Sequence, residues 1–268
     1  MTKVATELDK SKLAGIREEY DRAGYVIVRN VIDPDLAREG RAHIDWLLKK
    51  NPELRPEQLH NTLMPNDAFW VRLISDPRML DVAERFIGPN IALFASHYIA
   101  KRPVDGQAVL WHQDGSYWPL EPMDVTTLWL CLDESTPENG CMRVIPSTQH
   151  TELQVMKERR DVDNVLNSSI DDAWVDESKS VDIVLGAGDV SIHHPNVIHG
   201  STANTSAKWR CGLTIRYIPT STRIMRDGPW PSAFLLRGNA VAGINAYLPR
   251  PKWTAENSMP FRGQEGWE

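Results

Sequence analysis

The spacing of apolar residues predicts helices in the first ninety positions of the chain. In residues 10–23 apolar side chains recur every three or four positions, and Gly24 is placed to end that helix. Asp33-Pro34 and Asp76-Pro77 each combine an N-cap with proline at the first helical position. We therefore predict helices over residues 10–23, 34–50 and 77–88, with a short β-branched strand over residues 25–28.

From residue 91 onward the pattern changes to short apolar runs that are rich in β-forming residues. Strong turn sequences separate several of them, at residues 137–140 (Pro-Glu-Asn-Gly) and 186–189 (Gly-Ala-Gly-Asp). Several short strands at this spacing indicate an antiparallel sandwich or barrel. The predicted strands cover residues 91–100, 108–114, 126–132, 141–145, 181–185, 190–193 and 211–218.

Two segments interrupt or follow these strands. Residues 151–180 are polar and charged, and we interpret them as a long insertion between the halves of the barrel, a type of loop that is often a functional lid. Residues 220–268 carry Trp230, Trp253 and Trp267 among several prolines, and we expect them to wrap the barrel and cover its mouth. We predict a single domain over residues 1–268, with a mostly helical part (1–90), a β-rich core (91–219) and a C-terminal wrapping segment.

Composition narrows the class of protein. The chain has 268 residues and a net charge of -6 with both signs interspersed, which argues against nucleic acid or an anionic membrane as partner. Its three cysteines form no CxxC pair, as is typical of reduced thiols. The first residues are polar, with Lys3 and Glu7, and no apolar run reaches the roughly 20 residues of a membrane span. We expect a cytoplasmic protein that acts on a small molecule; the pattern indicates no oligomeric state.

A histidine and an aspartate, His112 and Asp114, lie one residue apart in the predicted strand 108–114. In an extended chain such side chains project from the same face. Together with one distant histidine they would form the three-ligand face that holds non-haem iron(II). The spacing alone is weak evidence, because His43 and Asp45 repeat it inside a predicted helix, where residues two apart point to nearly opposite sides. We interpret His43 as a surface or helix-packing histidine.

The third ligand has several candidates. An arginine whose guanidinium can take a carboxylate end-on suits a dicarboxylate co-substrate, and Arg210 follows His199 by eleven positions. Without Arg210, His199 and His194 would be equal candidates; with Arg210 and Ser201 we favour His199. The others lie in the helical half, in a polar segment or near strands, and the pattern does not exclude His97. The full set of candidates is His60, His97, His150, His193, His194 and His199.

Three motifs in order resemble the phytanoyl-CoA dioxygenase (PhyH) family of iron(II)- and 2-oxoglutarate-dependent oxygenases. They are residues 111–115 (WHQDG), residues 138–146 (ENGCMRVIP) and the HGS run at 199–201 followed by Asn204, Arg210 and Arg216-Tyr217. The resemblance covers about residues 25–219. It implies a double-stranded β-helix, a cupin-like jelly roll with supporting helices.

The same resemblance implies roles for individual residues. Iron would be bound by His112, Asp114 and His199, and Arg210 with Ser201 would hold the distal carboxylate of 2-oxoglutarate. We also assign Trp129 to the co-substrate site. Halogenating relatives carry Ala or Gly in place of the aspartate, so Asp114 favours oxygen transfer.

The chain departs from the family pattern at one position. The family has Pro-Gly-Ser/Thr-His after the Asn-Gly turn, whereas residues 146–149 here are Pro-Ser-Thr-Gln. The missing histidine is not one of the three expected ligands, so iron binding is unaffected. The departure puts in doubt any role of this turn in positioning the co-substrate.

These observations predict a dioxygenase that uses iron(II), 2-oxoglutarate and O2 to hydroxylate or otherwise oxidise a small organic molecule, in secondary metabolism, with release of succinate and CO2. Trp118 and Arg216 are the candidates for contact with the substrate, whereas we expect Lys101 and Arg102 to be solvated charges at a strand end. One alternative is a non-catalytic jelly-roll protein that binds a metal or ligand. Another is a metal-dependent oxygenase that uses no 2-oxoglutarate. Arg210 argues against the non-catalytic protein, because it has no purpose in a purely structural metal site. Calorimetric measurement of 2-oxoglutarate binding would separate the oxygenase that uses no 2-oxoglutarate.

Overall fold

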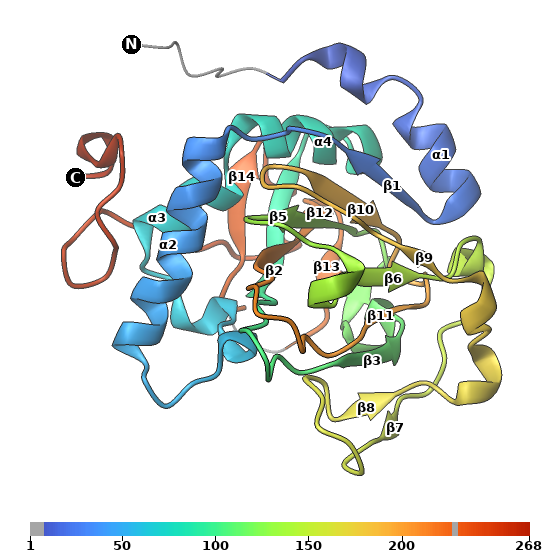
Figure 1. The fold of residues 1–268 in the computed structure, drawn as a ribbon. Helices are drawn as coiled ribbons and strands as arrows, with labels where there is room; N and C mark the ends of the chain where they lie inside the picture. The colour runs from blue at the N-terminus through green and yellow to red at the C-terminus, as the bar shows by residue number, and fades with distance from the viewer. Residues whose placement is uncertain (1–7, 227–229) are drawn as a thin grey trace.

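Two antiparallel sheets pack together at the centre of the computed structural model, which describes residues 8–226 and 230–268 (Figure 1). Lys3, Glu7 and the proline at position 229 lie outside the described residues. The larger sheet has the strand order β1 (Tyr25–Val28), β10 (Val190–His193), β5 (Thr126–Cys131), β12 (Gly212–Pro219), β2 (Ile91–Tyr98) and β14 (Phe234–Arg237). The smaller sheet has the order β3 (Val109–His112), β11 (His199–Ser201), β6 (Met142–Val144) and β9 (Val181–Asp182). This arrangement confirms the predicted jelly roll.

Four α-helices of the described residues support the sheets, and aspartate N-caps followed by proline mark the starts of two of them. These are α2 (Pro34–Lys50) and α4 (Pro77–Ile87), whose N-caps Asp33 and Asp76 accept hydrogen bonds from backbone N–H groups of the first turn. Helix α1 (Ile16–Ala23) is shorter than predicted, because Gly15 takes a left-handed conformation with φ of 72° and leaves residues 10–13 as a separate 3-10 turn. Helix α3 (Ala68–Ile74) was not predicted, although Asp67 caps it.

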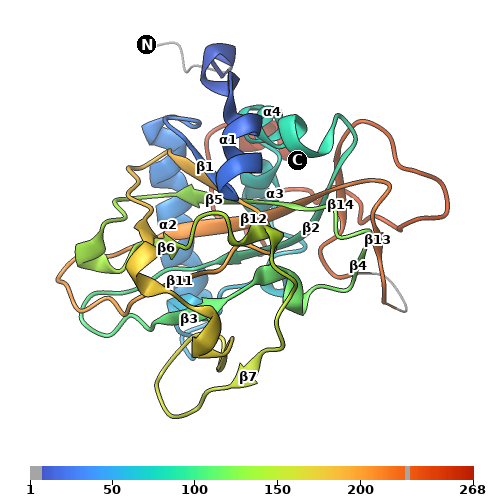
Figure 2. The same ribbon diagram turned by 90° about the vertical axis from the view of Figure 1, so that its right-hand side faces the viewer.

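The two faces of the larger sheet have different neighbours. Leu128, Leu130, Leu213 and Ile215 share one buried cluster with apolar residues of α2, α3 and α4, which therefore cover one face (Figures 1 and 2). The alternate residues of β5 and β12 point to the smaller sheet, as the period of two in a strand requires. The space between the sheets is thus lined by residues such as Trp129.

The insertion at residues 151–180 contains the short hairpin β7 (Lys157–Glu158) and β8 (Ser168–Ser169), which projects from the molecule beyond β3 (Figure 1). It is fastened to the strand of the H-x-D motif, because the N–H of Ile170 donates to the carbonyl of Trp111 at 2.9 Å. The Tyr117 hydroxyl lies 2.7 Å from the Ser168 hydroxyl. The insertion therefore runs along the edge of the smaller sheet.

The C-terminal segment is more regular than predicted. Strand β14 extends the larger sheet beside β2, and β13 (Arg223–Ile224) pairs with β4 (Leu120–Glu121). The last residues then lie beside α3, where the rings of Phe261 and Phe69 have centroids 5.6 Å apart (Figure 1). None of the described helices is long and apolar enough to cross a membrane.

Some predicted strands are shorter than expected. The strand predicted over 108–114 ends at His112, because Asp114 starts a 3-10 turn that runs to Tyr117. The turn packs closely against the insertion at Gly115, where a Cβ would lie 2.9 Å from the end of the Leu153 side chain. The strand predicted over 181–185 is regular only over residues 181–182.

Candidate metal centre and co-substrate pocket

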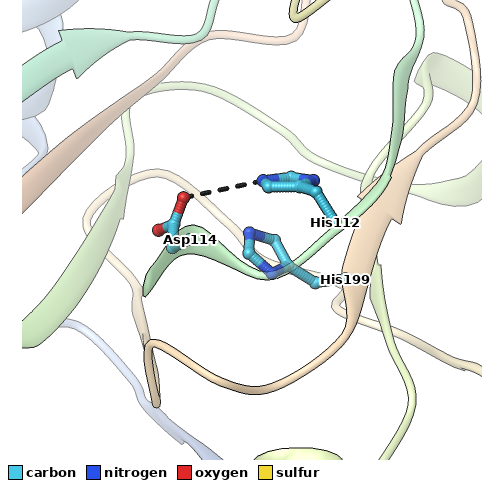
Figure 3. Close-up of side chains that lie close together, drawn as sticks. All are labelled: His112, Asp114 and His199. Atoms are coloured by element: carbon cyan, nitrogen blue, oxygen red, sulfur yellow. Dashed lines mark ion pairs between the residues drawn. The ribbon is translucent and has the colours of Figure 1, made fainter. Parts of the chain in front are cut away.

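His112, Asp114 and His199 converge between the two sheets and are all buried (Figure 3). Each offers a ligand atom, and these atoms lie within 4.8 Å of one another. The pairing of β11 with β3 places His199 directly opposite His112, so that their ring centroids are 4.0 Å apart. In the described part of the chain this is the one group of three such side chains with that geometry.

Both histidines have the tautomer that a metal requires. The Nδ1 atom of His112 lies 2.8 Å from the Leu110 carbonyl, and that of His199 lies 3.0 Å from the Val197 carbonyl. A carbonyl only accepts hydrogen bonds, so each Nδ1 carries the proton and each Nε2 keeps a free lone pair. Burial lowers the pKa of His199 well below its usual value, and the neighbouring histidines add to this effect. Both rings are therefore oriented by their Nδ1 contacts with the Nε2 atom available as a ligand.

Asp114 supplies the negative charge of the cluster. Burial alone would raise its pKa, but the Arg216 guanidinium, 3.6 Å from Oδ1, and the neighbouring His112 and His193 side chains hold the pKa well below the usual value. His193 Nε2 lies 3.4 Å from Oδ2. Two imidazole nitrogens and one carboxylate on one side of a buried space fit the ligand preference of iron(II).

Arg210 is a buried cation without a counter-ion. Its side chain is 1% exposed, and no acidic side chain among the described residues forms an ion pair with it. One Nη donates to the Ile99 carbonyl at 3.1 Å, the guanidinium lies 5.3 Å from the centroid of the Trp129 ring, and Nε has no partner in the described structure. An unpaired buried charge is unfavourable, so this environment favours the binding of an anion.

The Trp129 ring reaches its place under Arg210 because residue 212 is glycine. A Cβ at Gly212 would lie 2.0 Å from an atom of that ring. The two residues sit on neighbouring strands, since β12 pairs with β5 throughout. Gly212 therefore sets how closely the aromatic ring approaches β12, and through the ring where the guanidinium lies.

Lys101 is not solvated, which corrects the expectation from the sequence. It is fully buried, and its Nζ donates to the Ser201 hydroxyl at 2.7 Å and to the Thr202 carbonyl. Its backbone pairs with that of Arg210 through two hydrogen bonds of 2.7 and 3.0 Å. Burial lowers the pKa of Lys101 well below its usual value, and Arg210 adds to this. Arg102 is exposed and paired with Asp105, as expected.

The Asn-Gly turn braces the chain segments that carry Ser201 and Arg210. Asn139 is buried and its Nδ2 donates to the carbonyl of Trp209 at 3.0 Å. Gly140 has φ of 74°, and a Cβ there would lie 2.6 Å from the carbonyl oxygen of Thr202. Gln149, where the chain departs from the family pattern, instead donates to the carbonyl of Asp21 in α1. The departure is thus separate from this brace.

One cavity brings most of the predicted residues together. Trp118 is not among its lining residues, because its ring lies under the Arg216 guanidinium (5.2 Å) and packs against Phe94. Sequence reasoning kept His97 and His193 only as candidates for the third ligand, and both line the cavity. It did not single out Leu166 or Thr214, although Thr214 has the same parity in β12 as Arg216. The lining residues are His97, Ile99, Val109, His112, Asp114, Trp129, Met142, Leu166, His193, His199, Gly200, Ser201, Arg210, Thr214 and Arg216.

The second copy of the H-x-D spacing has no part in this cavity. His43 is fully buried between α2 and β2, with Nδ1 2.7 Å from the Tyr98 hydroxyl and Nε2 2.7 Å from an Asp67 carboxylate oxygen. Asp45 is exposed and paired with Arg41. The interpretation of His43 as a helix-packing residue is confirmed.

Known proteins are similar to this chain in sequence and in fold. The family model for phytanoyl-CoA dioxygenase (PhyH) matches residues 20–212. The chain is 28% identical to L-proline trans-4-hydroxylase of Streptomyces griseoviridis, over 76% of this chain and 86% of the relative. It is 30% identical to a probable alpha-ketoglutarate-dependent hypophosphite dioxygenase of Stutzerimonas stutzeri, over 54% of this chain and about half (51%) of that protein. The structure of the non-heme monooxygenase ThoJ in its apo form superposes with a TM-score of 0.74 at 22% identity, over 88% of each chain, which supports the fold.

Proposed function

Since this chain belongs to the phytanoyl-CoA dioxygenase (PhyH) family of iron(II)- and 2-oxoglutarate-dependent oxygenases, we propose that it hydroxylates a small organic molecule. The observation that carries the proposal is the position of the unpaired Arg210 in the same cavity as the His112, Asp114 and His199 cluster. A metal site with only a structural role would give the buried guanidinium no purpose. Succinate and CO2 are the expected co-products.

Each residue of the cluster has a defined task in this proposal. His112 and His199 offer Nε2 and Asp114 offers a carboxylate oxygen, while the proton on each Nδ1 keeps the rings oriented through the backbone carbonyls. Bound iron, with 2-oxoglutarate and O2, supplies the oxidising chemistry. The protein's contribution is to hold these groups together in a buried space from which bulk water is excluded.

Arg210 and Ser201 are proposed to hold the distal carboxylate of 2-oxoglutarate. The Arg210 guanidinium supplies charge-assisted hydrogen bonds, and the Trp129 ring beneath it limits its motion. Ser201 Oγ accepts a hydrogen bond from Lys101 Nζ at 2.7 Å. Its own hydroxyl hydrogen is therefore free to be donated to the carboxylate.

The alternative of a non-catalytic binding protein lacks a supporting observation. Closed metal coordination by four protein ligands is typical of structural sites, whereas the cluster here offers three. An oxygenase that uses no 2-oxoglutarate would leave Arg210 unpaired. A setting in secondary metabolism stays a prediction from the sequence.

The first test is spectroscopic. Anaerobic addition of iron(II) and 2-oxoglutarate should produce a metal-to-ligand charge-transfer absorption, and the purified protein should release succinate slowly in air. Asp114→Ala should abolish both signals. The matched control is Asp45→Ala, which removes the aspartate of the second H-x-D pair and should retain both. Survival of the signals in the Asp114 variant would overturn the assignment.

A further inference from the structure

Two guanidinium groups line the cavity, but the proposed co-substrate site uses only Arg210. Arg216 lies on the same face of the chain, six positions further on. One Nη donates to the Thr214 hydroxyl at 3.0 Å, and the Trp118 ring lies 5.2 Å from the guanidinium carbon. These contacts fix the side chain in place without neutralising its charge.

The side-on edge of Arg216 carries a hydrogen-bond donor that is not used. Its Nε is buried and lacks a hydrogen-bond partner within the described residues, and the neighbouring Nη2 is 3.6 Å from Asp114 Oδ1. Guanidinium groups bind carboxylates through two parallel N–H donors, and the Nε and Nη2 edge is one such pair. Asp114 faces this edge at longer than hydrogen-bond distance.

Charge counting indicates what completes the cavity. Asp114 is the single acidic side chain among the described residues that line it. The charges of iron(II) and of the 2-oxoglutarate dianion cancel, so two guanidinium groups and one carboxylate leave one positive charge. A net charge in a buried site is unfavourable, and a monoanion would remove it.

We propose that Arg216 binds the carboxylate of the substrate, which is a small monocarboxylic acid; this inference rests on the proposed function. Arg216 approaches Asp114, one of the proposed metal ligands, so a carboxylate held there lies beside the metal. The carbon that is oxidised is then separated from the carboxyl group by only a few bonds. Larger molecules would bind with only their acidic end in the cavity.

The carboxylate that binds Arg216 could also come from 2-oxoglutarate, because the carboxylate next to its keto group is an oxyanion near the metal. The test therefore uses protein that already holds iron(II) and 2-oxoglutarate under anaerobic conditions. Calorimetry measures binding of matched pairs of a monoanion and its neutral amide: hexanoate and hexanamide, benzoate and benzamide. Separate titrations measure 2-oxoglutarate through the charge-transfer absorption, and succinate release in air is recorded for every pair.

We expect an acid to bind at least about tenfold more tightly than its amide, since a charge-assisted hydrogen-bonded pair is lost. Arg216→Gln should weaken binding of that acid by about tenfold to a hundredfold, leave its amide unchanged, and alter 2-oxoglutarate affinity by less than about threefold. The matched control is Arg226→Gln, an exposed arginine that changes the net charge equally and should leave acid binding intact.

Three outcomes overturn the proposal. They are equal binding of acid and amide, no binding of any tested acid at about 10 mM, or an Arg216→Gln variant that binds 2-oxoglutarate more weakly and the acid as well as wild type does. The last outcome would assign Arg216 to the co-substrate. In all three cases the wild-type protein would still release succinate without substrate if the proposed function is right. Absence of that basal release would refute the proposed function itself.

Discussion

Replacing Lys101 by methionine should weaken 2-oxoglutarate binding without unfolding the protein. Lys101 Nζ donates to Ser201 Oγ at 2.7 Å, which directs the hydroxyl hydrogen of Ser201 away from the lysine and toward the proposed carboxylate. Methionine has a similar length but no donor. Ser201 would then be free to turn its hydrogen elsewhere.

The expected size follows from these contacts. A hydrogen bond to a charged group contributes about 1.5–3 kcal/mol, and Arg210 remains in place, so we expect affinity to fall about tenfold. The free energy of unfolding should change by less than about 1.5 kcal/mol, because methionine fills a similar volume and the cost of burying the polar amine disappears.

The assay compares two 2-oxo acids by anaerobic titration of the charge-transfer absorption. The variant should bind 2-oxoglutarate about tenfold more weakly and 2-oxopentanoate, which lacks the distal carboxylate, almost as well as wild type. Lys208→Met is the control, because Lys208 is half-exposed and pairs only with surface glutamates. Equal losses for both acids would mean a general structural effect, and no loss would refute the role of Lys101.

Three further substitutions probe the supports of the site and the core. Gly212→Ala should push the Trp129 ring away, destabilise the protein by about 1–3 kcal/mol and weaken 2-oxoglutarate binding; unchanged affinity in the same titration would contradict the account of the aromatic support. His43→Leu should lower the free energy of unfolding in urea by about 3–5 kcal/mol, because its carboxylate and hydroxyl partners lose their shared hydrogen-bond partner, and a loss below about 1 kcal/mol would show that this network contributes little. Burial lowers the pKa of His97 to about 4, so between about pH 4 and 6.5 the unfolded chain binds one proton more and stability falls as the pH falls. Burial raises the pKa of Asp133 to about 6, so below that pH the folded chain binds more protons at Asp133 than the unfolded chain does. Asp133 therefore increases stability as the pH falls, which opposes the effect of His97. His97→Asn should therefore reduce the fall in stability by about 3 kcal/mol, and denaturation curves with an unchanged pH dependence would argue against a buried neutral His97.

The parts of the fold that the sequence predicts are those set by local chemistry. The Asp-Pro pairs predict the starts of α2 and α4 because the capping hydrogen bonds lie within one helical turn. The H-x-D pair could be judged from its neighbours, since strand-forming residues surround His112 and helix-forming residues surround His43. Strand β14 could not be predicted, because what stabilises it is the free edge of β2, far away in the sequence.

The parts of the site that were missed depend on long-range pairing. Lys101 follows a strand and has the composition of a solvated charge, but its pairing with Arg210 draws it into the interior. Trp118 lies four positions after Asp114, yet the 3-10 turn between them carries its ring behind Arg216. Spacing and residue type do not predict either position, because Lys101 pairs with Arg210 and Trp118 packs against Arg216, and both arginines are distant in the sequence.

The register of β3 with β11 links acquisition of the metal to folding. His112 and His199 meet only because they are opposite each other on two strands that come from distant parts of the sequence. A shift by one residue would turn one of the rings to the other face of the sheet and remove the site. Iron therefore binds the correctly paired chain and not its mispaired forms, and by mass action it increases the population of molecules with native pairing. Cells that are short of iron would hold more of this chain with the smaller sheet open, and protease sensitivity of the β3 segment would report that population.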